Sequence, residues 1–317
     1  MPVIEYVEDR MESEELLERL CPPVRNWFKD KFPDFTEPQK VAIPRILNGE
    51  HLLLCSPTGS GKTLTAFLTI IDDLVRRSLD GSLPDAVQCV YISPIKALAN
   101  DIEKNLMGPL GEIKERYLPS RAKEIKVGLR TGDTPQSERE KMLRKPPHIL
   151  ITTPESLGLG LASKRFRPIL DQMKWFIIDE MHSLVPTKRG THLSLSMALM
   201  DSVVSSDVQR IGISATMEPL DAVAEFLVAS DSRESDVEPQ KVAIAKISGD
   251  RELDLDIILP TQRFSSIPVK EILDHNVDRI KELAEAHTTT LVFVNTRNMT
   301  ETVVQRLKIA GMEGVEG

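Results

Sequence analysis

Short apolar runs alternate with helix-length segments from about residue 50 onward. The runs predicted to be strands are Leu52–Ser56, Val87–Ser93, Ile125–Leu129, Ile149–Thr152, Trp175–Asp179 and Arg210–Ser214. Helix-length segments such as Lys62–Leu79, Ile95–Tyr117 and Thr191–Val204 separate them. Nearly continuous apolar strands separated by helices are typical of a parallel sheet that helices cover on both faces. The pattern therefore predicts an α/β domain that binds its ligands at the carboxyl ends of the strands.

The segments on either side of this core have other patterns. Before the core, Ser13–Asp30 predicts one amphipathic helix. After it, the sequence predicts an acidic loop, two β-patterned runs and a linker, at Ser230–Glu238, Val242–Ile247, Leu253–Leu259 and residues 260–268. The chain then predicts a helix, a strand and a helix, at Val269–Ala286, Thr290–Val294 and Met299–Ile309. One strand and two helices are too few for a stable second domain.

Composition narrows the class of protein. The chain has 317 residues, of which 41% are hydrophobic and 28% are charged, enough for one full domain and part of a second. No apolar run approaches the roughly 20 residues of a membrane span, and no signal-peptide pattern is evident. The three cysteines match neither a zinc spacing nor a disulfide framework. We therefore expect buried thiols in a reducing, cytoplasmic compartment and no membrane partner.

Charge does not identify the substrate. The formal net charge is −8, which is unusual for a nucleic-acid binder. Residues 1–20 carry seven acidic and two basic residues, whereas residues 121–145 carry eight basic and four acidic residues. This distribution is compatible with a phosphate-tracking face and equally with mixed, solvated helix faces.

A phosphate-binding loop follows the first predicted strand. Residues 56–63 read Ser-Pro-Thr-Gly-Ser-Gly-Lys-Thr and open a predicted helix. Glycines let backbone N–H groups approach phosphate oxygens, and the helix directs its positive end at the same anion. In such a loop the lysine reaches the β- and γ-phosphates and the hydroxyl after it ligates Mg²⁺. Ser56 occupies a position where the usual pattern has glycine.

Two carboxylates follow another predicted strand. Asp179 and Glu180 come directly after Trp175–Ile178, so we expect them at the same sheet edge as the phosphate loop. A carboxylate at that place holds Mg²⁺, directly or through water, and a neighbouring one orients the attacking water. Ser214-Ala215-Thr216 also follows a strand and is expected at this edge.

These motifs, with several others in order, resemble superfamily-two DExH-box helicases over roughly residues 35–310. The matching segments are Phe35–Gln39, residues 56–63, Ser93–Asp101, Arg130–Thr134, Thr153–Leu157, Asp179–His182, Ser214–Thr216 and Leu291–Arg297. The wording of Ser93–Asp101, Arg189–Leu193 and Leu291–Arg297 is most similar to the Lhr, or large helicase-related, group, with Ski2-type helicases the nearest alternative.

The resemblance implies a RecA-like P-loop domain that uses ATP and Mg²⁺ to move a single strand of DNA or RNA. It implies adenine recognition by Gln39, metal binding by Thr63 and Asp179, and activation of water by Glu180. The implied nucleotide site also contains Thr58, Gly59, Ser60, Gly61 and Lys62, and the implied coupling residues are His182, Ser214 and Thr216. The implied nucleic-acid contacts are Pro94, Lys96, Thr131, Gly132, Thr153 and Pro154. The distinction between DNA and RNA is left open, because such contacts are mainly to the backbone.

The resemblance also divides the chain. It implies an N-terminal helical extension over 1–34, a first RecA-like domain over 35–259, a linker over 260–268, and a truncated start of a second RecA-like domain over 269–317. The family's arginine-bearing motifs belong to that second domain and do not occur in this sequence. We therefore expect this chain by itself to have little activity. The alternatives are a nucleotide- and nucleic-acid-binding module without significant turnover and a P-loop ATPase that acts on another partner.

Overall fold

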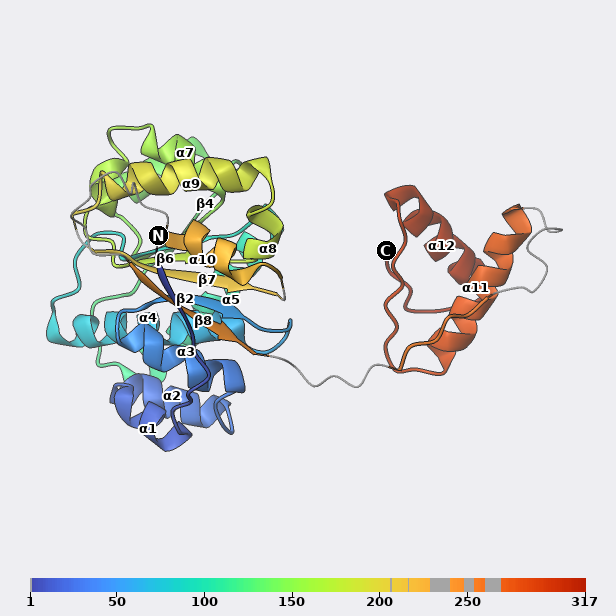
Figure 1. Cartoon of the computed structure of the whole chain (residues 1–317), viewed down its shortest axis with the longest axis horizontal. Helices are drawn as coiled ribbons and strands as arrows, with labels where there is room; N and C mark the ends of the chain where they lie inside the picture. The colour runs from blue at the N-terminus through green and yellow to red at the C-terminus, as the bar shows by residue number, and fades with distance from the viewer. Residues whose placement is uncertain (1, 206, 216, 229–239, 248–253, 260–268) are drawn as a thin grey trace. The chain divides into compact units, whose positions relative to one another are not determined.

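The computed structural model describes residues 2–205, 207–215, 217–228, 240–247, 254–259 and 269–317 (Figure 1). The chain forms two compact units, Met1–Asp250 and Arg251–Gly317. The predicted loop Ser230–Glu238 and the predicted linker over 260–268 lie outside the described residues.

The first unit is built around one eight-stranded sheet in which every neighbouring pair is parallel. Its strands are β1 Val3–Tyr6, β2 His51–Cys55, β3 Cys89–Ile92, β4 Val127–Arg130, β5 Ile149–Thr152, β6 Trp175–Ile178, β7 Gln209–Ser214 and β8 Lys241–Lys246. The strand order is β1-β8-β2-β7-β6-β3-β5-β4. The predicted parallel α/β architecture is confirmed. Strand β1 was not predicted from the sequence; it is a short edge strand that pairs with β8.

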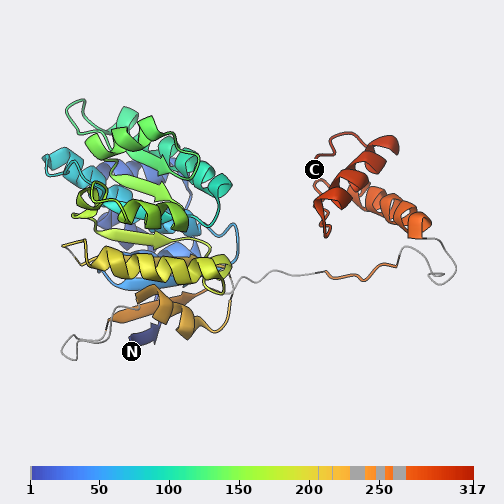
Figure 2. The same cartoon turned by 90° about the horizontal axis from the view of Figure 1, so that it is seen from above.

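Helices cover both faces of this sheet (Figures 1 and 2). They are α1 Ser13–Arg19, α2 Pro22–Lys31, α3 Glu37–Leu47, α4 Lys62–Asp80, α5 Lys96–Tyr117, α6 Gln136–Arg144, α7 Pro154–Leu161, α8 Met181–Leu184, α9 Lys188–Asp201 and α10 Leu220–Val228, with a 3₁₀ turn at Arg167–Leu170. One buried cluster packs side chains of α1 to α5 on one face, and a second packs those of α7 to α10 on the other. Because side chains alternate across a strand, Leu52 and Leu54 enter the first cluster while Leu53 enters the second.

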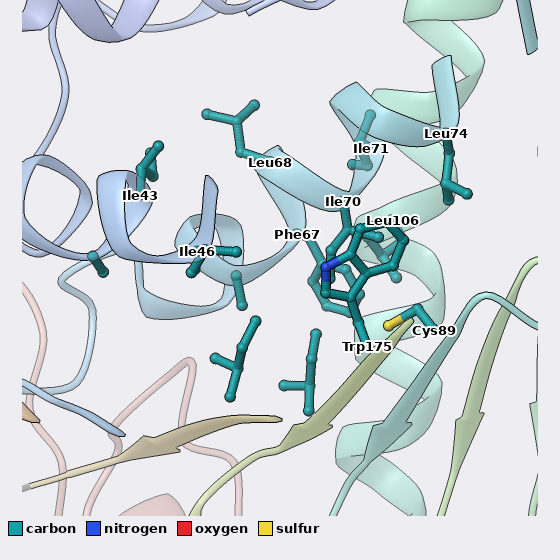
Figure 3. Close-up of a cluster of buried hydrophobic side chains, with 14 of the residues drawn as sticks. Ile43, Ile46, Phe67, Leu68, Ile70, Ile71, Leu74, Cys89, Leu106 and Trp175 are labelled. Carbon is teal, nitrogen blue, oxygen red and sulfur yellow. The ribbon is translucent and has the colours of Figure 1, made fainter. Parts of the chain in front are cut away.

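Helix α4 supplies much of the first cluster. Phe67, Ile70, Ile71 and Leu74 are each at most 1% exposed, and Figure 3 shows them with Trp175 of β6 and other buried side chains. Burying a large apolar side chain contributes roughly 1.5–3 kcal/mol. The helix that begins at the phosphate loop is therefore fixed to the sheet along its length.

The prediction of one helix over Ser13–Asp30 is wrong. The segment forms α1 and α2, with extended backbone at Leu20 and Cys21 between them. Pro22 follows Cys21 directly, and a residue before proline is driven out of the helical region. The proline then occupies the first position of α2, where no backbone donor is needed.

The second unit contains α11 Val269–Glu285 and α12 Arg297–Ile309, near their predicted bounds. The predicted strand Thr290–Val294 is wrong, because this segment is not a strand and leaves Phe293 89% exposed. The strand predicted over Leu253–Leu259 is likewise wrong for its described residues, 254–259, which are all exposed. A strand needs a hydrogen-bonding partner, and the described residues of this unit contain no strand with which either segment could pair.

Within the described ranges, none of the helices combines the length and the apolar character that crossing a membrane would require.

Backbone amides of the two units should differ in hydrogen exchange. Residues 176–178 of β6 are buried and lie between β3 and β7, whereas residues 291–294 have no strand partner among the described residues. We expect the amides of 291–294 to exchange early and those of 176–178 to be among the slowest. Exchange resolved by mass spectrometry measures both segments in one sample. Equal protection would show that 291–294 is paired in solution.

Candidate functional site

The strand order sorts the predicted functional loops into two groups along the carboxyl edge of the sheet. β2, β7 and β6 are neighbours, and they lead into the phosphate loop, Ser214 and Asp179 respectively. β3, β5 and β4 are also neighbours, and they precede the three segments predicted to contact nucleic acid. Residues far apart in the sequence are thereby brought to one edge, as the strand pattern predicts.

The phosphate loop depends on two glycines with left-handed backbone. Gly59 and Gly61 have φ of 79° and 86°, values that residues with a Cβ rarely adopt. Gly61 also packs closely, because a Cβ there would lie 3.4 Å from Nε2 of Gln39. Ser56, at the position where the usual pattern has glycine, is buried, and its hydroxyl lies 2.7 Å from that of Ser60. The serine at 56 thus stabilises the loop from within.

Lys62 is folded back onto its own loop. Its ammonium donates to the carbonyl oxygens of Ser56 at 2.7 Å and Pro57 at 2.8 Å. Burial lowers the pKa of Lys62, and the nearby carboxylates of Glu180 and Asp179 oppose that shift. Lys62 therefore lies between the loop and the carboxylates.

Gln39 and Thr36 pack against this loop. Gln39 is 3% exposed, and its Oε1 accepts a hydrogen bond from the Thr36 backbone at 2.9 Å in a capping box at the start of α3. The Thr36 hydroxyl donates to the Ser60 carbonyl at 3.1 Å. The predicted adenine-reading residue is thus adjacent to the phosphate loop, and in this structure it also caps a helix.

Asp179 and Glu180 differ in environment. Asp179 is 3% exposed; burial raises its pKa, while a hydrogen bond from the Tyr91 hydroxyl opposes that shift. Glu180 has φ 50° and is the single non-glycine residue with positive φ in the described part of the chain. Such backbone costs about 1–3 kcal/mol and often marks functional sites. Its N–H donates to Oδ1 of Asp179 at 2.9 Å, which helps to hold this conformation.

His182 joins the carboxylate segment to the end of β7. Its Nδ1 lies 3.2 Å from Oε2 of Glu180 and 3.4 Å from the Ser214 hydroxyl. The Ala215 N–H donates to the same nitrogen at 3.3 Å. The predicted coupling residues His182 and Ser214 are therefore in contact, whereas Thr216 lies outside the described residues.

A cavity of about 430 Å³ opens beside these groups. The phosphate loop contributes Thr58, Gly59 and Gly61 to its lining, the first turn of α4 contributes Lys62 and Thr63, and Asp179 and Glu180 also line it. Asn105 and several apolar side chains from α4 and α5 line the rest. Cation, hydroxyl and carboxylates thus meet in one concave space, an arrangement suited to a phosphorylated ligand and a hard metal ion.

The second group of loops presents an exposed cation. Lys96, at the start of α5, is 2.6 Å from the Asp133 carboxylate and lies against Gly132. Pro94 and Thr131 are buried, and the Thr131 hydroxyl accepts from the Asp133 backbone at 3.3 Å. The exposed members of this set are therefore Lys96, Gly132 and Asp133.

The start of α7 is also shaped from within. The buried Thr153 hydroxyl accepts from the Ser156 N–H at 3.4 Å, and Pro154 occupies the first helical position. Arg189 of α9 forms two hydrogen bonds, of 2.5 and 3.1 Å, with the carboxylate of Glu155. That ion pair lowers the pKa of Glu155. Thr153 therefore orients the helix start, and its hydroxyl is not displayed at the surface.

Tyr91 is a site residue that the sequence analysis missed. It lies in the middle of β3 and is fully buried, yet its hydroxyl reaches Oδ2 of Asp179. The one sequence feature that could have indicated its role is a hydroxyl-bearing side chain within the otherwise apolar run Cys89–Ile92.

The sequence profile of the DEAD/DEAH box helicases matches residues 36–224, well over half of the chain. The chain belongs to the DEAD/DEAH box helicase family. It is 44% identical, over 99% of its length, to "ATP-dependent helicase Lhr-Core" of Methanocaldococcus jannaschii. It is 47% identical, over 96% of its length, to the protein of the same name from Methanothermobacter thermautotrophicus. The predicted resemblance to the Lhr group is confirmed.

Solved structures agree with this assignment. Helicase Lhr of Mycobacterium smegmatis, bound to ssDNA and AMP-PNP, matches 94% of this helicase chain with a TM-score of 0.79 and 37% identity, and the match covers 37% of that protein. The chain likewise covers 36% and 35% of the two curated relatives. It therefore spans about a third of the length of these Lhr helicases.

Substituting alanine for glycine at the two ends of α4 separates backbone strain from loss of the site. Gly61 and Gly81 both have positive φ, but a Cβ at Gly81 would meet nothing within 4 Å. We expect Gly61→Ala and Gly81→Ala each to lower the free energy of unfolding by roughly 1–2 kcal/mol. Only Gly61→Ala should also weaken nucleotide binding, by about tenfold or more, because it moves N–H groups that are predicted to face phosphate. Denaturant unfolding and calorimetric titration test this. Equal nucleotide affinities in the two variants would contradict it.

Proposed function

We propose that the intact protein is an ATP-dependent nucleic-acid helicase or translocase of the Lhr type, and that this chain supplies its ATP-binding domain. The observation that carries the proposal is the division of the carboxyl edge into a nucleotide group on β2, β7 and β6 and a strand-contacting group on β3, β5 and β4. The family and its Lhr relatives support the same activity. Further segments of the intact protein would complete the helicase.

In the nucleotide group, Lys62 would exchange the carbonyls of Ser56 and Pro57 for β- and γ-phosphate oxygens. The Gly59 and Gly61 backbone would line the phosphates, and Gln39 would recognise adenine. The Glu180 carboxylate would orient the attacking water and accept its proton. Its strained backbone supports this assignment, because it restricts where the carboxylate lies.

The donor set fits Mg²⁺. The Thr63 hydroxyl and the Asp179 carboxylate both line the cavity, and Mg²⁺ prefers oxygen ligands while keeping several waters and phosphate oxygens. When bound there, Mg²⁺ would neutralise charge that develops on the phosphates. Thr63 and Asp179 would be its protein ligands.

The second group would hold a single strand of DNA or RNA by its phosphates. Lys96 would supply the cation, and Gly132 and the start of α7 would offer backbone N–H groups, because Thr131 and Thr153 are buried in structural hydrogen bonds. Pro94 and Pro154 would shape the turns that present these groups. The M. smegmatis relative is described as bound to ssDNA.

Ser214 and Thr216 would couple domain closure to the Asp179–His182 segment through His182, which lies 3.4 Å from the Ser214 hydroxyl. We also propose that residues 269–317 begin a second RecA-like domain, that 1–34 is an extension and 260–268 a linker, and that the protein acts in the cytoplasm, where its proposed nucleotide and strand are found.

One observation favours a second candidate function, that of a nucleotide- and strand-binding module with little turnover. The described lining of the 430 Å³ cavity contains Lys62 but no arginine. Arginines that stabilise the transition state of phosphoryl transfer are worth about 10³–10⁵ in rate. Turnover by this chain, compared with that of the intact protein, separates the two candidates.

Two substitutions separate nucleotide binding from chemistry. We expect Lys62→Ala to weaken binding of Mg·ATP roughly 10- to 100-fold, because it removes a charge-assisted hydrogen bond to phosphate. Glu180→Gln should bind ATP as the unsubstituted chain does but lose turnover in the intact protein. Titration calorimetry and phosphate release measure the two effects. A folded chain that binds no nucleotide would refute the phosphate-loop assignment.

A pair of charge reversals on α5 tests the strand face. Lys96 and Lys114 lie about 27 Å apart along this helix, and each pairs with an exposed carboxylate at 2.6 Å. We expect Lys96→Glu to weaken binding of single strands of any sequence. The slope of log affinity against log salt concentration should become shallower by about 0.7 for each phosphate that is no longer neutralised. Lys114→Glu, beyond the roughly 8–10 Å screening length, should have little effect. Fluorescence anisotropy against DNA and RNA oligonucleotides measures both; equal losses would show that only net charge matters.

A further inference from the structure

Tyr91 occupies a position between the two groups expected to bind the metal ion. It lies on β3, is 0% exposed, and stacks on Phe67 of α4 with ring centroids 4.9 Å apart. Its hydroxyl donates to Oδ2 of Asp179, at the end of β6, and Thr63, in the first turn of α4, lies nearby. One buried side chain therefore holds Asp179 and lies near Thr63.

Packing alone does not explain the hydroxyl. A phenylalanine would fill the same space and stack on Phe67 without introducing a buried polar group, which costs free energy unless it is hydrogen bonded. The phenol hydroxyl meets that requirement by donating to Oδ2 of Asp179. A side chain that could pack as phenylalanine therefore carries a hydroxyl whose partner is the carboxylate expected to hold the metal ion.

The two oxygens of Asp179 have separate donors. Oδ2 accepts from Tyr91, and Oδ1 accepts from the Glu180 N–H at 2.9 Å. The Asp179 backbone is fixed independently, because its N–H donates to the Ile92 carbonyl of β3 at 2.9 Å. Removing the Tyr91 hydroxyl would therefore release the orientation of the carboxylate while the backbone and the ring stack remain.

We propose that Tyr91 is a positioning residue whose hydroxyl holds the Asp179 carboxylate in the orientation that, together with Thr63, receives the Mg²⁺ of a bound nucleotide. This inference rests on the proposed function, since it assumes that Asp179 and Thr63 hold that ion. Hydrogen-bond partners of metal ligands fix ligand geometry, and their loss typically weakens metal binding about 10- to 100-fold.

The test is Tyr91→Phe in this chain, with ADP binding measured by calorimetry across a Mg²⁺ series and in EDTA. We expect unchanged ADP affinity in EDTA, because the phosphate loop is intact. The Mg²⁺ concentration needed for half of the metal-dependent gain in affinity should rise about tenfold or more. Thermal unfolding and circular dichroism of the same samples verify the fold. A metal requirement equal to that of the unsubstituted chain would overturn the proposal, as would an equal loss of affinity in EDTA and Mg²⁺.

Tyr117→Phe is the matched control. Tyr117 is the last residue of α5, and its hydroxyl also donates to an aspartate, Asp30 of α2. Neither residue lines the cavity. This variant should keep the metal requirement of the unsubstituted chain. A similar rise in Tyr117→Phe would overturn a specific role for Tyr91.

A double-mutant cycle shows whether Tyr91 acts through Asp179. In an Asp179→Ala background, adding Tyr91→Phe should cause no further loss of the Mg²⁺ effect, because the group that it positions is gone. A further loss of the full size would overturn the proposal. If the unsubstituted chain binds ADP with no dependence on Mg²⁺, the metal assignment in the proposed function is refuted. If the unsubstituted chain depends on Mg²⁺ and Tyr91→Phe depends on it equally, only the role of Tyr91 is refuted.

Discussion

Parallel pairing of the central strands is the constraint on which every candidate site depends. Because β2, β7, β6 and β3 run in the same direction and are paired in register, the residues that follow them emerge at one edge. Their side chains enter two buried clusters, one on each face, so the strands cannot slide without exposing apolar residues to water. The positions at which the loops leave the sheet are therefore fixed.

Three basic side chains at this edge already bind oxygen atoms of the protein. Lys62 is bound by two backbone carbonyls, Lys96 by Asp133, and Arg189 by Glu155. A phosphate that binds Lys62 or Lys96 must replace these partners, so the free energy of binding is the difference between two sets of interactions. For Lys96, exposed and paired with an exposed carboxylate, the internal pair contributes little, about 0–1 kcal/mol. For the largely buried Lys62 the exchange takes place in a less polar environment, where charge–charge interactions are stronger.

The boundary between the two groups of loops falls between β6 and β3. Asp179 follows β6, and the segment of Lys96 follows β3, and these two strands are hydrogen bonded along their length. A change in how Asp179 is held therefore lies one strand away from the residues expected to touch nucleic acid. In the proposed function, this proximity would give a short physical connection between the bound nucleotide and the bound strand.

The sequence by itself determined the strands β2 to β8, several of the helices between them and the loop residues at the carboxyl edge, because long apolar runs and the glycine-rich loop are local signals. Tertiary structure decided what has no local signal. Strand β1 exists only because β8 offers it an edge, and Thr290–Val294, despite an apolar run, is not a strand because its unit's described residues provide no such edge. The contact of Tyr91 with Asp179 joins residues 88 positions apart, and the burial of Thr131 and Thr153 follows from packing around them. Local pattern fixes which segments can form strands and loops; pairing and burial decide which of them do, and which side chains reach the site.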